Sequence, residues 1–346
     1  MRIVVVGGTG IISSSIVEAL AQSGHEVAVF NRGQRSGTLP QGVRYLRGDR
    51  SDRTAFEATM QAGRFDVAID MICFTAADAA SSLRAFRGVK QLIHTSTCAT
   101  FGGPLAETPA DETTPLQPNT DYGRNKVAAD DLLLAAHRRG EIAVTVFKPY
   151  YIWAPGMFIC RQLGQDRRWI DRMRRGLPLL VTGGGQLLMH HCHADDVAIA
   201  YAASADRACC LGQTYIVTSP HAMTWQEYHE RIGAALGYAV TLVDAPADLL
   251  LRVWPQNTKL LAWETQWSHV YSLERIRRDI PEFRPRITLE EGIAPCIAWM
   301  EANGLIEDAL SHRTEDGIIA AIDGLWRACG AGRGGSRTVE EDSKDE

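Results

Sequence analysis

The chain has 346 residues, of which 45% are hydrophobic and 22% are charged, and its formal net charge is −5 at pH 7. This length can bury the core of a large domain with a smaller lobe, and the acidic balance excludes a broad electrostatic attraction to nucleic acid or anionic lipid. The apolar run after Met1 ends at Gly7, too early for a signal-peptide core or a membrane span, so we expect a cytoplasmic protein. The eight cysteines contain no Cys-x-x-Cys pair, which indicates reduced thiols and no metal site.

Short β-branched runs alternate with helix-like stretches along the first half of the chain. The runs are residues 3–6, 27–30, 43–46, 67–69, 92–94 and 144–147, and a further run at 215–217 returns later. Continuously apolar strands that alternate with helices are typical of a parallel sheet covered on both faces. The sequence therefore predicts an α/β fold with a doubly wound parallel sheet, the Rossmann architecture, and a smaller α/β C-terminal substrate lobe.

A glycine-rich turn follows the first predicted strand and leads into a helix-like stretch, with the sequence Gly7-Gly8-Thr9-Gly10-Ile11-Ile12-Ser13. Glycines allow the backbone to approach a pyrophosphate, and a helix N-terminus offers free N–H groups to it. We therefore predict a dinucleotide site that includes Gly7, Gly10, Ile11 and Ile12. Ser13 stands where a third glycine is usual, so we expect the helix to pack differently on the strand there.

The end of the second predicted strand carries no acidic residue. Asn31-Arg32-Gly33 stands there, with Arg35 close behind. NAD-binding sites normally place a carboxylate at this point for the ribose, whereas a guanidinium can bind the 2′-phosphate of NADP. We therefore predict NADP, with NAD as the alternative, held by Asn31, Arg32 and Arg35, although Arg32 could also be a solvated surface charge. Asp49, after the third strand, is either a ligand of the adenine amino group or the start of a loop.

Tyr122 and Lys126 lie one turn apart at the start of a predicted helix, so their side chains share one face. The pKa of a free tyrosine is about 10, and the charges of Lys126 and an oxidised nicotinamide ring would both favour its anion. Tyr122 would then exchange a proton with a substrate hydroxyl or carbonyl while a hydride moves to or from the ring. The hydroxyl-rich residues 95–102 follow the fifth strand and would face the same crevice.

On these motifs the chain resembles the extended short-chain dehydrogenase/reductases, specifically the NAD-dependent epimerase/dehydratase family, over about its first 300 residues. The resemblance rests on the glycine motif, residues 66–76, the Ser/Thr segment, the Tyr122 and Lys126 pair, Lys148-Pro149-Tyr150 and His193-Ala194-Asp195-Asp196. Aligned on Phe101-Gly102, it implies that Thr97 is the catalytic hydroxyl beside Tyr122 and Lys126, with Ser96 as a neighbour that could replace it. The alternative is that both hydroxyls merely end a strand. The resemblance also implies cofactor contacts from Tyr122, Lys126 and Pro149, and a homodimer.

The sequence predicts the following division into domains. Residues 1–155 form the dinucleotide-binding Rossmann domain, to which a segment at about 190–219 returns. Residues 156–189 and 220–305 form the substrate-binding lobe, and residues 306–329 form a C-terminal helical segment. Residues 330–346 are predicted to be disordered, because a tail rich in Gly, Ser and acidic residues has few apolar side chains to offset the entropy of ordering.

Six residues are expected to line the substrate site: Ser96, Cys98, Tyr150, Tyr151, Met189 and His191. Family dehydratases carry an Asp-Glu pair directly after the catalytic hydroxyl, and related decarboxylases a nearby Glu, so Cys98-Ala99 argues against both reactions. Met189 stands where family enzymes that act on nucleotide sugars often have a diphosphate-binding arginine, which weakens the case for such a substrate. Three nearby histidines lack carboxylate or thiolate ligands in a metal-type pattern, so we predict no metal site.

The leading hypothesis is an NAD(P)-dependent epimerase that acts on a secondary alcohol of a sugar, nucleotide-sugar or nucleoside-like substrate through a transient keto intermediate. The alternative is a net NADPH-dependent ketoreductase or dehydrogenase of a sugar-like or secondary-metabolite substrate, which Arg32 favours. A third hypothesis is a dinucleotide-binding regulator without catalysis, because a fold alone never establishes a function. The presence of Thr97, Tyr122 and Lys126 argues against it.

Overall fold

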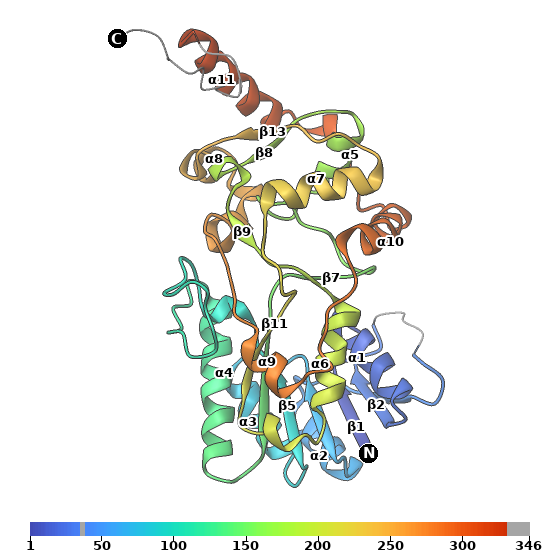
Figure 1. Ribbon diagram of the computed structural model, residues 1–346. Coiled ribbons are helices and arrows are strands. Elements are labelled where there is room, and N and C mark those ends of the chain that lie inside the picture. Colours follow the sequence, from blue (N-terminus) through green and yellow to red (C-terminus); the bar gives the residue numbers. More distant parts are fainter. Residues whose placement is uncertain (35–38, 331–346) are drawn as a thin grey trace.

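A seven-stranded parallel sheet forms the centre of the larger domain in the computed structural model, which describes residues 1–34 and 39–330 (Figure 1). The strand order is β11-β6-β5-β4-β1-β2-β3. The bounds of the strands are β1 (Arg2–Val6), β2 (Glu26–Asn31), β3 (Arg44–Arg47), β4 (Val67–Asp70), β5 (Gln91–Thr95), β6 (Val144–Pro149) and β11 (Thr214–Val217). Every predicted strand is present, and the doubly wound fold is confirmed. The order changes direction between β1 and β4, which opens a ligand crevice at their carboxyl ends.

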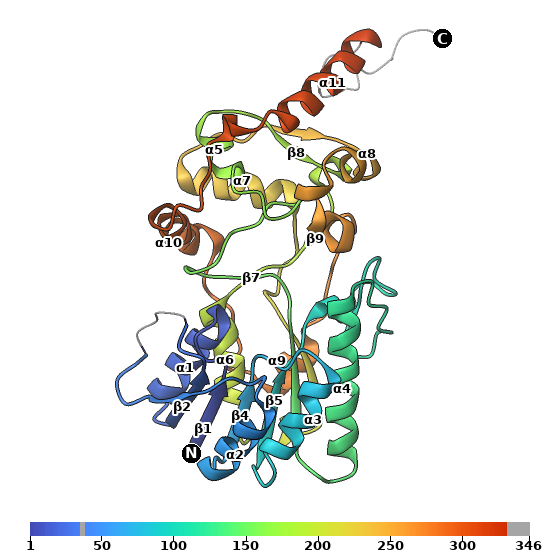
Figure 2. The ribbon, with the colours of Figure 1, turned by 180° about the vertical axis from the view of Figure 1, so that it is seen from behind.

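Helices cover both faces of this sheet (Figures 1 and 2). Side chains alternate along β1, so Ile3 and Val5 belong to one apolar cluster, whereas Val4 and Val6 belong to another on the opposite face. The first face is covered by α1 (Ile11–Gln22) and α6 (Ala194–Ser204). The second face is covered by α2 (Arg53–Gly63), α3 (Ala76–Ala85) and α4 (Asp121–Arg138). Two buried layers therefore hold the sheet and leave its carboxyl edge open.

A smaller lobe lies beyond the carboxyl edge of the sheet (Figure 1). It contains three two-stranded pairs: β7 (Ile152–Trp153) with β10 (Cys192–His193), β9 (Leu188–Met189) with β12 (Met223–Thr224), and β8 (Leu179–Val181) with β13 (Leu242–Asp244). Its principal helices are α5 (Trp169–Arg174), α7 (Trp225–Leu236), α8 (Ala247–Val253) and α10 (Leu289–Ala302). Short 3-10 helices lie at Cys98–Thr100, Gly183–Gly185, Ala208–Cys210, Pro255–Asn257 and Ala309–Ser311, and a π-helix spans Leu261–Thr265.

Two later helices lie outside the body of the lobe. Helix α9 (Glu274–Asp279) packs against β11 of the central sheet, although it falls within the range predicted for the lobe. Helix α11 (Thr314–Ala328) falls in the predicted C-terminal helical segment and extends away from the rest of the molecule (Figures 1 and 2). Of the predicted disordered tail, residues 331–346 lie outside the described residues. Within the described ranges, no helix combines the length and the apolar character needed to cross a membrane.

A buried ion-pair network attaches the start of α11 to the lobe. The guanidinium of Arg161 is fully buried and lies 2.7 Å from Oε1 of Glu315. The same carboxylate accepts a hydrogen bond from the backbone N–H of Leu180 and lies 3.3 Å from Nε of Arg172. Because buried charges persist only when they are paired and hydrogen-bonded, this network fixes the start of α11 on the lobe. Further along the helix, Ile319 and Ile322 join an apolar cluster of the lobe.

Candidate active site

The glycine-rich turn lies where the crevice opens, between β1 and α1. Gly7 has φ +82, and a Cβ at this position would lie 2.7 Å from Cγ2 of Ile72, so the turn requires glycine. Gly7 and Gly10 line a groove of about 500 Å³ along the ends of β1 and β2, and Ile11 and Ile12 follow as the first turn of α1. Ser13 closes the turn, because its hydroxyl donates to the carbonyl of Gly7 and accepts from the N–H of Gly10.

The end of β2 forms the far wall of this groove. The side chain of Asn31 is held in place, since its amide donates to Thr9 Oγ1 and its oxygen accepts from the N–H of Gly33 and the hydroxyl of Tyr45. Arg32 is exposed and lines the groove. Arg35 lies outside the described residues. Arg47, at the end of β3, places its guanidinium beside Gly33, a cation that the sequence prediction missed because no motif marks it.

Asp49 also lines the groove, at the end of β3. Its Oδ1 accepts hydrogen bonds from both the N–H and the hydroxyl of Ser51, at 2.9 and 2.8 Å, and these bonds lower the pKa of the carboxyl group. The residue therefore begins a loop and still faces the groove, so both sequence interpretations of Asp49 agree with its position.

Thr97, Tyr122 and Lys126 come together at the carboxyl ends of β4 and β5. Helix α4 begins at the N-cap Thr120, whose hydroxyl accepts from the N–H of Gly123, and this places Tyr122 and Lys126 on one face. Thr97 and Tyr122 line the same pocket, and a hydrogen bond links their side chains. The ammonium of Lys126 lies 6.0 Å from the centre of the Tyr122 ring. The three residues therefore have the relative positions that the sequence predicted.

Burial shifts the pKa values of Tyr122 and Lys126 in opposite directions. Loss of solvent raises the pKa of Tyr122, and its hydrogen bond with Thr97 only partly opposes the shift. Loss of solvent lowers the pKa of Lys126, whose Nζ donates to the backbone carbonyls of Cys73 and Thr95 at 2.8 and 2.6 Å. The Tyr122 hydroxyl is therefore protonated at neutral pH in this state, and the ammonium of Lys126 is fixed beneath it.

A second buried network supports the strand that carries Thr97. The carboxylate of Asp130 on α4 lies 2.6 Å from Nζ of Lys148, accepts from the hydroxyl of Ser96 at 2.7 Å, and lies 3.1 Å from Nε2 of His94. Burial alone would raise the pKa of Asp130, but the charge of Lys148 and the nearby ring of His94 outweigh it and hold the pKa at about 2. Lys148 and Asp130 thus form an ion pair behind the active site.

This network corrects the predicted role of Ser96. Its side chain points into the protein toward Asp130 and is 3% exposed, whereas the neighbouring Thr97 faces the pocket. The reason is the extended backbone after β5, which sends successive side chains to opposite sides. Ser96 therefore neither lines the pocket nor stands in for Thr97.

Three other residues that were predicted to contact the substrate contact other parts of the protein instead. Each of them points into the lobe or into its junction with the sheet. The hydroxyl of Tyr151 donates to the carbonyl of Cys160 at 2.9 Å. Met189 is fully buried where β9 pairs with β12. His191 accepts a hydrogen bond from the indole of Trp153. Burial lowers the pKa of His191 to about 4, so it is a neutral structural side chain.

Cys98 lines the pocket, whereas Tyr150 lies behind the lining residue His269 and Pro149 ends the neighbouring strand β6. Cys98 lines the pocket wall, and its thiol donates to the carbonyl of Lys148. Tyr150 is buried and stacks on His269, with its hydroxyl hydrogen-bonded to the carboxyl group of Glu264. Pro149 ends β6 in register with Val217. Within the described part of the chain, no group of His, Cys, Asp and Glu side chains could hold a metal ion.

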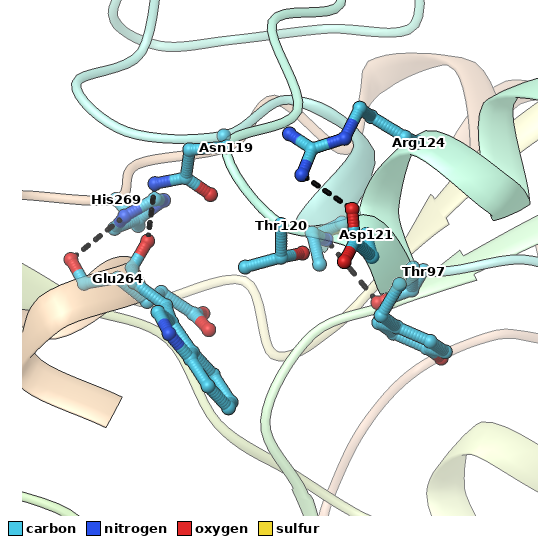
Figure 3. Close-up of a pocket in the computed structure, with 12 residues that line it drawn as sticks. Thr97, Asn119, Thr120, Asp121, Arg124, Glu264 and His269 are labelled. Carbon is cyan, nitrogen blue, oxygen red and sulfur yellow. Dashed lines mark hydrogen bonds and ion pairs between the residues drawn. The ribbon is translucent and has the colours of Figure 1, made fainter. Parts of the chain in front are cut away.

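The pocket above Thr97 and Tyr122 has a volume of about 630 Å³. Thr97, Asp121 and Arg124 lie on one side of it, and Glu264 and His269 lie on the opposite side (Figure 3). The lining residues are Thr97, Cys98, Ala99, Gly102, Asn119, Thr120, Asp121, Tyr122, Arg124, Trp263, Glu264 and His269. The sequence prediction missed Asn119, Trp263 and Glu264. These residues lie in segments without a motif, and only the tertiary fold brings them to the pocket that Thr97 and Tyr122 line.

Residues 3–215 match the family model described as the NAD dependent epimerase/dehydratase family. The 2′-dehydrokanamycin reductase of Streptomyces kanamyceticus is 30% identical over 311 residues, which cover 89% of this chain and 87% of that protein. The UDP-glucose 4-epimerase of Streptomyces lividans is 30% identical over 172 residues, which cover 42% of this chain and 51% of that protein. The solved structure of a Thermus thermophilus UDP-glucose 4-epimerase in complex with NAD has a TM-score of 0.67 at 22% identity, covering 87% of this chain and 99% of that one.

Proposed function

The chain belongs to the NAD-dependent epimerase/dehydratase family of extended short-chain dehydrogenase/reductases, and on that premise we propose that it is an NADPH-dependent reductase of a ketone on a sugar-like substrate. Membership makes it an NAD(P)-dependent epimerase or oxidoreductase; the reductive reaction, the cofactor and the substrate class are our proposal. The observation that carries the choice is the end of β2, where no carboxylate stands, Arg32 lines the groove, and the guanidinium of Arg47 lies beside Gly33. Two guanidinium groups favour a 2′-phosphate there.

The cofactor preference bears on the type of reaction. An epimerase returns the hydride that it removes, so it consumes no reducing equivalent and gains nothing by selecting NADPH. A reductase delivers the hydride permanently and benefits from a cofactor that cells keep reduced. A groove suited to NADPH therefore supports net reduction, which reverses the order of the two hypotheses drawn from the sequence.

The protonation state of Tyr122 is compatible with net reduction. Bound NADPH would supply the hydride to the carbonyl carbon of the substrate. The hydroxyl of Tyr122, whose pKa is raised by burial, would donate its proton to the carbonyl oxygen, while Thr97 would hold that oxygen by a hydrogen bond. The ammonium of Lys126 would stabilise the phenolate left on Tyr122. One hydride and one proton convert the ketone to a secondary alcohol, and no further acid or base is needed.

The lining of the pocket and one relative that aligns with most of the chain support the substrate class. Arg124 is the arginine of the pocket lining, and it lies 2.6 Å from Asp121, whose negative charge offsets part of its attraction for a diphosphate. The 2′-dehydrokanamycin reductase acts, by its name, on a ketone of a sugar-containing compound. We carry that class, a keto sugar without a nucleotide, to this chain.

The decisive experiment follows the absorbance of reduced cofactor when purified protein is mixed with NADPH and 2′-dehydrokanamycin. We expect one NADPH to be oxidised for each alcohol formed. UDP-glucose, incubated with NAD or NADP, is the comparison substrate. Its conversion to the 4-epimer without net cofactor change would support the second candidate, a UDP-sugar epimerase, which the Streptomyces lividans relative favours. Conversion of UDP-glucose alone would overturn the reductase proposal.

Cofactor selection gives the first prediction. Arg32→Ala and Arg47→Ala are each expected to raise the Kd for NADPH about tenfold or more, because a charge-assisted hydrogen bond to a phosphate contributes about 1.5–3 kcal/mol. The Kd for NADH should stay unchanged. Arg44→Ala is the matched control, since Arg44 lies on the same strand as Arg47 and covers the ring of Phe65. Titration of cofactor fluorescence measures both constants, and equal weakening of both cofactors would contradict the assignment.

Four further sequence predictions remain part of this proposal. They are the division into a Rossmann domain and a substrate lobe, the cofactor contacts of Ile11, Ile12, Asp49 and Pro149, the cytoplasmic location, and the homodimer. Sedimentation of the purified protein tests the last of them.

A further inference from the structure

The pocket contains a carboxylate without a charged partner. Glu264 lies on the π-helix Leu261–Thr265, a form of helix that often occurs at functional sites. Its carboxyl group is hydrogen-bonded to the hydroxyl of Tyr150, and within the described ranges it forms no ion pair. The carboxyl group lies across the pocket from Thr97 (Figure 3). A carboxylate removed from water without a counter-ion is costly, so a ligand that supplies a positive charge would compensate for that cost.

The other ionisable groups of the lining do not balance Glu264. Arg124 is neutralised by Asp121. His269 uses both ring nitrogens, one with the hydroxyl of Tyr271 at 3.1 Å and one with the backbone carbonyl of Glu264 at 3.2 Å. Burial lowers the pKa of His269 to about 4, so the ring is neutral. When Glu264 is ionised, the pocket therefore carries a net negative charge, which repels a diphosphate and attracts a cation.

An aromatic wall lies next to this carboxylate. Trp263 lines the pocket and is 50% exposed, although its backbone is held by a hydrogen bond from the amide of Asn119 to its carbonyl, at 2.7 Å. An exposed indole face can pack against the C–H groups of a sugar ring, and it attracts an ammonium group through its ring electrons. Both features suit a polyhydroxylated ring that carries an amine.

We propose that Glu264 binds a protonated amine of the substrate, so that this enzyme selects amino-sugar ketones over neutral ones. The inference deepens the proposed reductase, on which it rests, by naming the charge of its substrate. The ammonium would form an ion pair with the carboxylate of Glu264 while Trp263 supports the ring. The ketone would then lie across the pocket at Thr97 and Tyr122.

The ionisation of Glu264 should make the affinity for an ammonium ligand depend on pH, which a purely structural role of this residue would not do. Burial raises the pKa of this carboxyl group to about 7, and the hydrogen bond from Tyr150 only partly opposes the shift. The ionisable groups that face Glu264 are Tyr150, Cys98, His269 and Tyr271. His269 is neutral, and burial raises the pKa of the other three groups. None of the four therefore becomes charged near neutral pH. An ammonium ligand favours the ionised carboxyl group, so its affinity should fall as the pH decreases below about 7.

The test compares Glu264→Gln with the native enzyme and with Glu230→Gln, a control on the exposed side of α7. Substrates are 2′-dehydrokanamycin and the same ketone acetylated on its amines. We expect native enzyme and control to prefer the free amine by about 10- to 100-fold in kcat/KM, the range for a charge-assisted hydrogen bond, and Glu264→Gln to abolish that preference. Glu264→Asp keeps the negative charge and should retain part of the preference for the free amine. Normal NADPH binding by each variant shows that it is folded.

Binding without turnover separates this inference from the proposed function. Calorimetry of the amino-sugar alcohol with the NADP complex should show affinity falling about tenfold per pH unit below about 7 in native enzyme, and no such change in Glu264→Gln. If this dependence appears but no ketone consumes NADPH, the inference stands and the reductase fails. If NADPH is consumed equally with free and acetylated ketone in native enzyme and in Glu264→Gln, the reductase stands and the inference is overturned.

Discussion

Replacing Tyr122 by phenylalanine is expected to lower kcat for ketone reduction by about 10²- to 10⁴-fold, the usual contribution of a positioned acid. The variant keeps the ring that covers Lys126 and removes only the hydroxyl that lies beside Thr97. Without that hydroxyl the proposed proton donor is lost, although Thr97 can still hold the carbonyl oxygen by a hydrogen bond. Single-turnover oxidation of bound NADPH measures the chemical step directly and separates it from product release.

A matched tyrosine in the lobe provides the control for this experiment. Tyr238→Phe removes a hydroxyl from a half-buried residue just after α7, away from the pocket, and should leave kcat within about twofold of the native value. If Tyr122→Phe retained native kcat under the same conditions, another group would have to supply the proton. The assignment of Thr97, Tyr122 and Lys126 would then be wrong.

Replacing Asp130 by alanine is expected to lower the free energy of unfolding by about 3–5 kcal/mol, because it leaves the buried ammonium of Lys148 without its counter-ion. The carboxylate also holds Ser96 at 2.7 Å, so its loss should displace Thr97 and reduce kcat as well. Urea unfolding measures the first effect. Asp131→Ala is the matched control, since the neighbouring carboxylate is exposed and should change stability by no more than about 0.5 kcal/mol.

A double variant distinguishes a lost ion pair from a general loss of packing. Asp130→Leu combined with Lys148→Met removes both buried charges, and it should destabilise the protein less than Asp130→Ala alone. Equal destabilisation would show that the charge of Lys148 is not the cause. The pH dependence has a definite sign: the pKa of Asp130 is lowered to about 2 in the folded state, so its charge stabilises the protein above about pH 4 and that contribution is lost between about pH 4 and 2.

Local sequence was sufficient for the fold because each element is determined by residues close together in the chain. The seven apolar runs form the seven strands, and the turn at Gly7 requires glycine. The spacing of Tyr122 and Lys126 places both side chains on one helical face wherever that helix packs. The Ser/Thr segment ends a parallel strand, so it must lie at the carboxyl edge of the sheet.

Predictions about which neighbouring side chain faces the pocket were less successful. Ser96 and Thr97 are adjacent hydroxyl residues, and only the direction of the backbone after β5 turns the first toward Asp130 and the second toward the pocket. Alignment with the family likewise assigns Met189 and His191 to the substrate site, but the packing of the lobe buries them against other parts of the protein. A pattern of residue types does not carry this information.

The sequence by itself predicted the cofactor-binding architecture and the proposed redox group, since Gly7, Tyr122 and Lys126 are positioned by near neighbours in the chain. Only the tertiary structure decided the character of the substrate pocket. Glu264 and Trp263 lie far along the chain from Thr97, and no motif marks them. The π-helix brings them to the pocket wall, where burial without a counter-ion gives the carboxylate its affinity for a cation. Such long-range contacts depend on the packing of lobe against sheet, which no local pattern encodes.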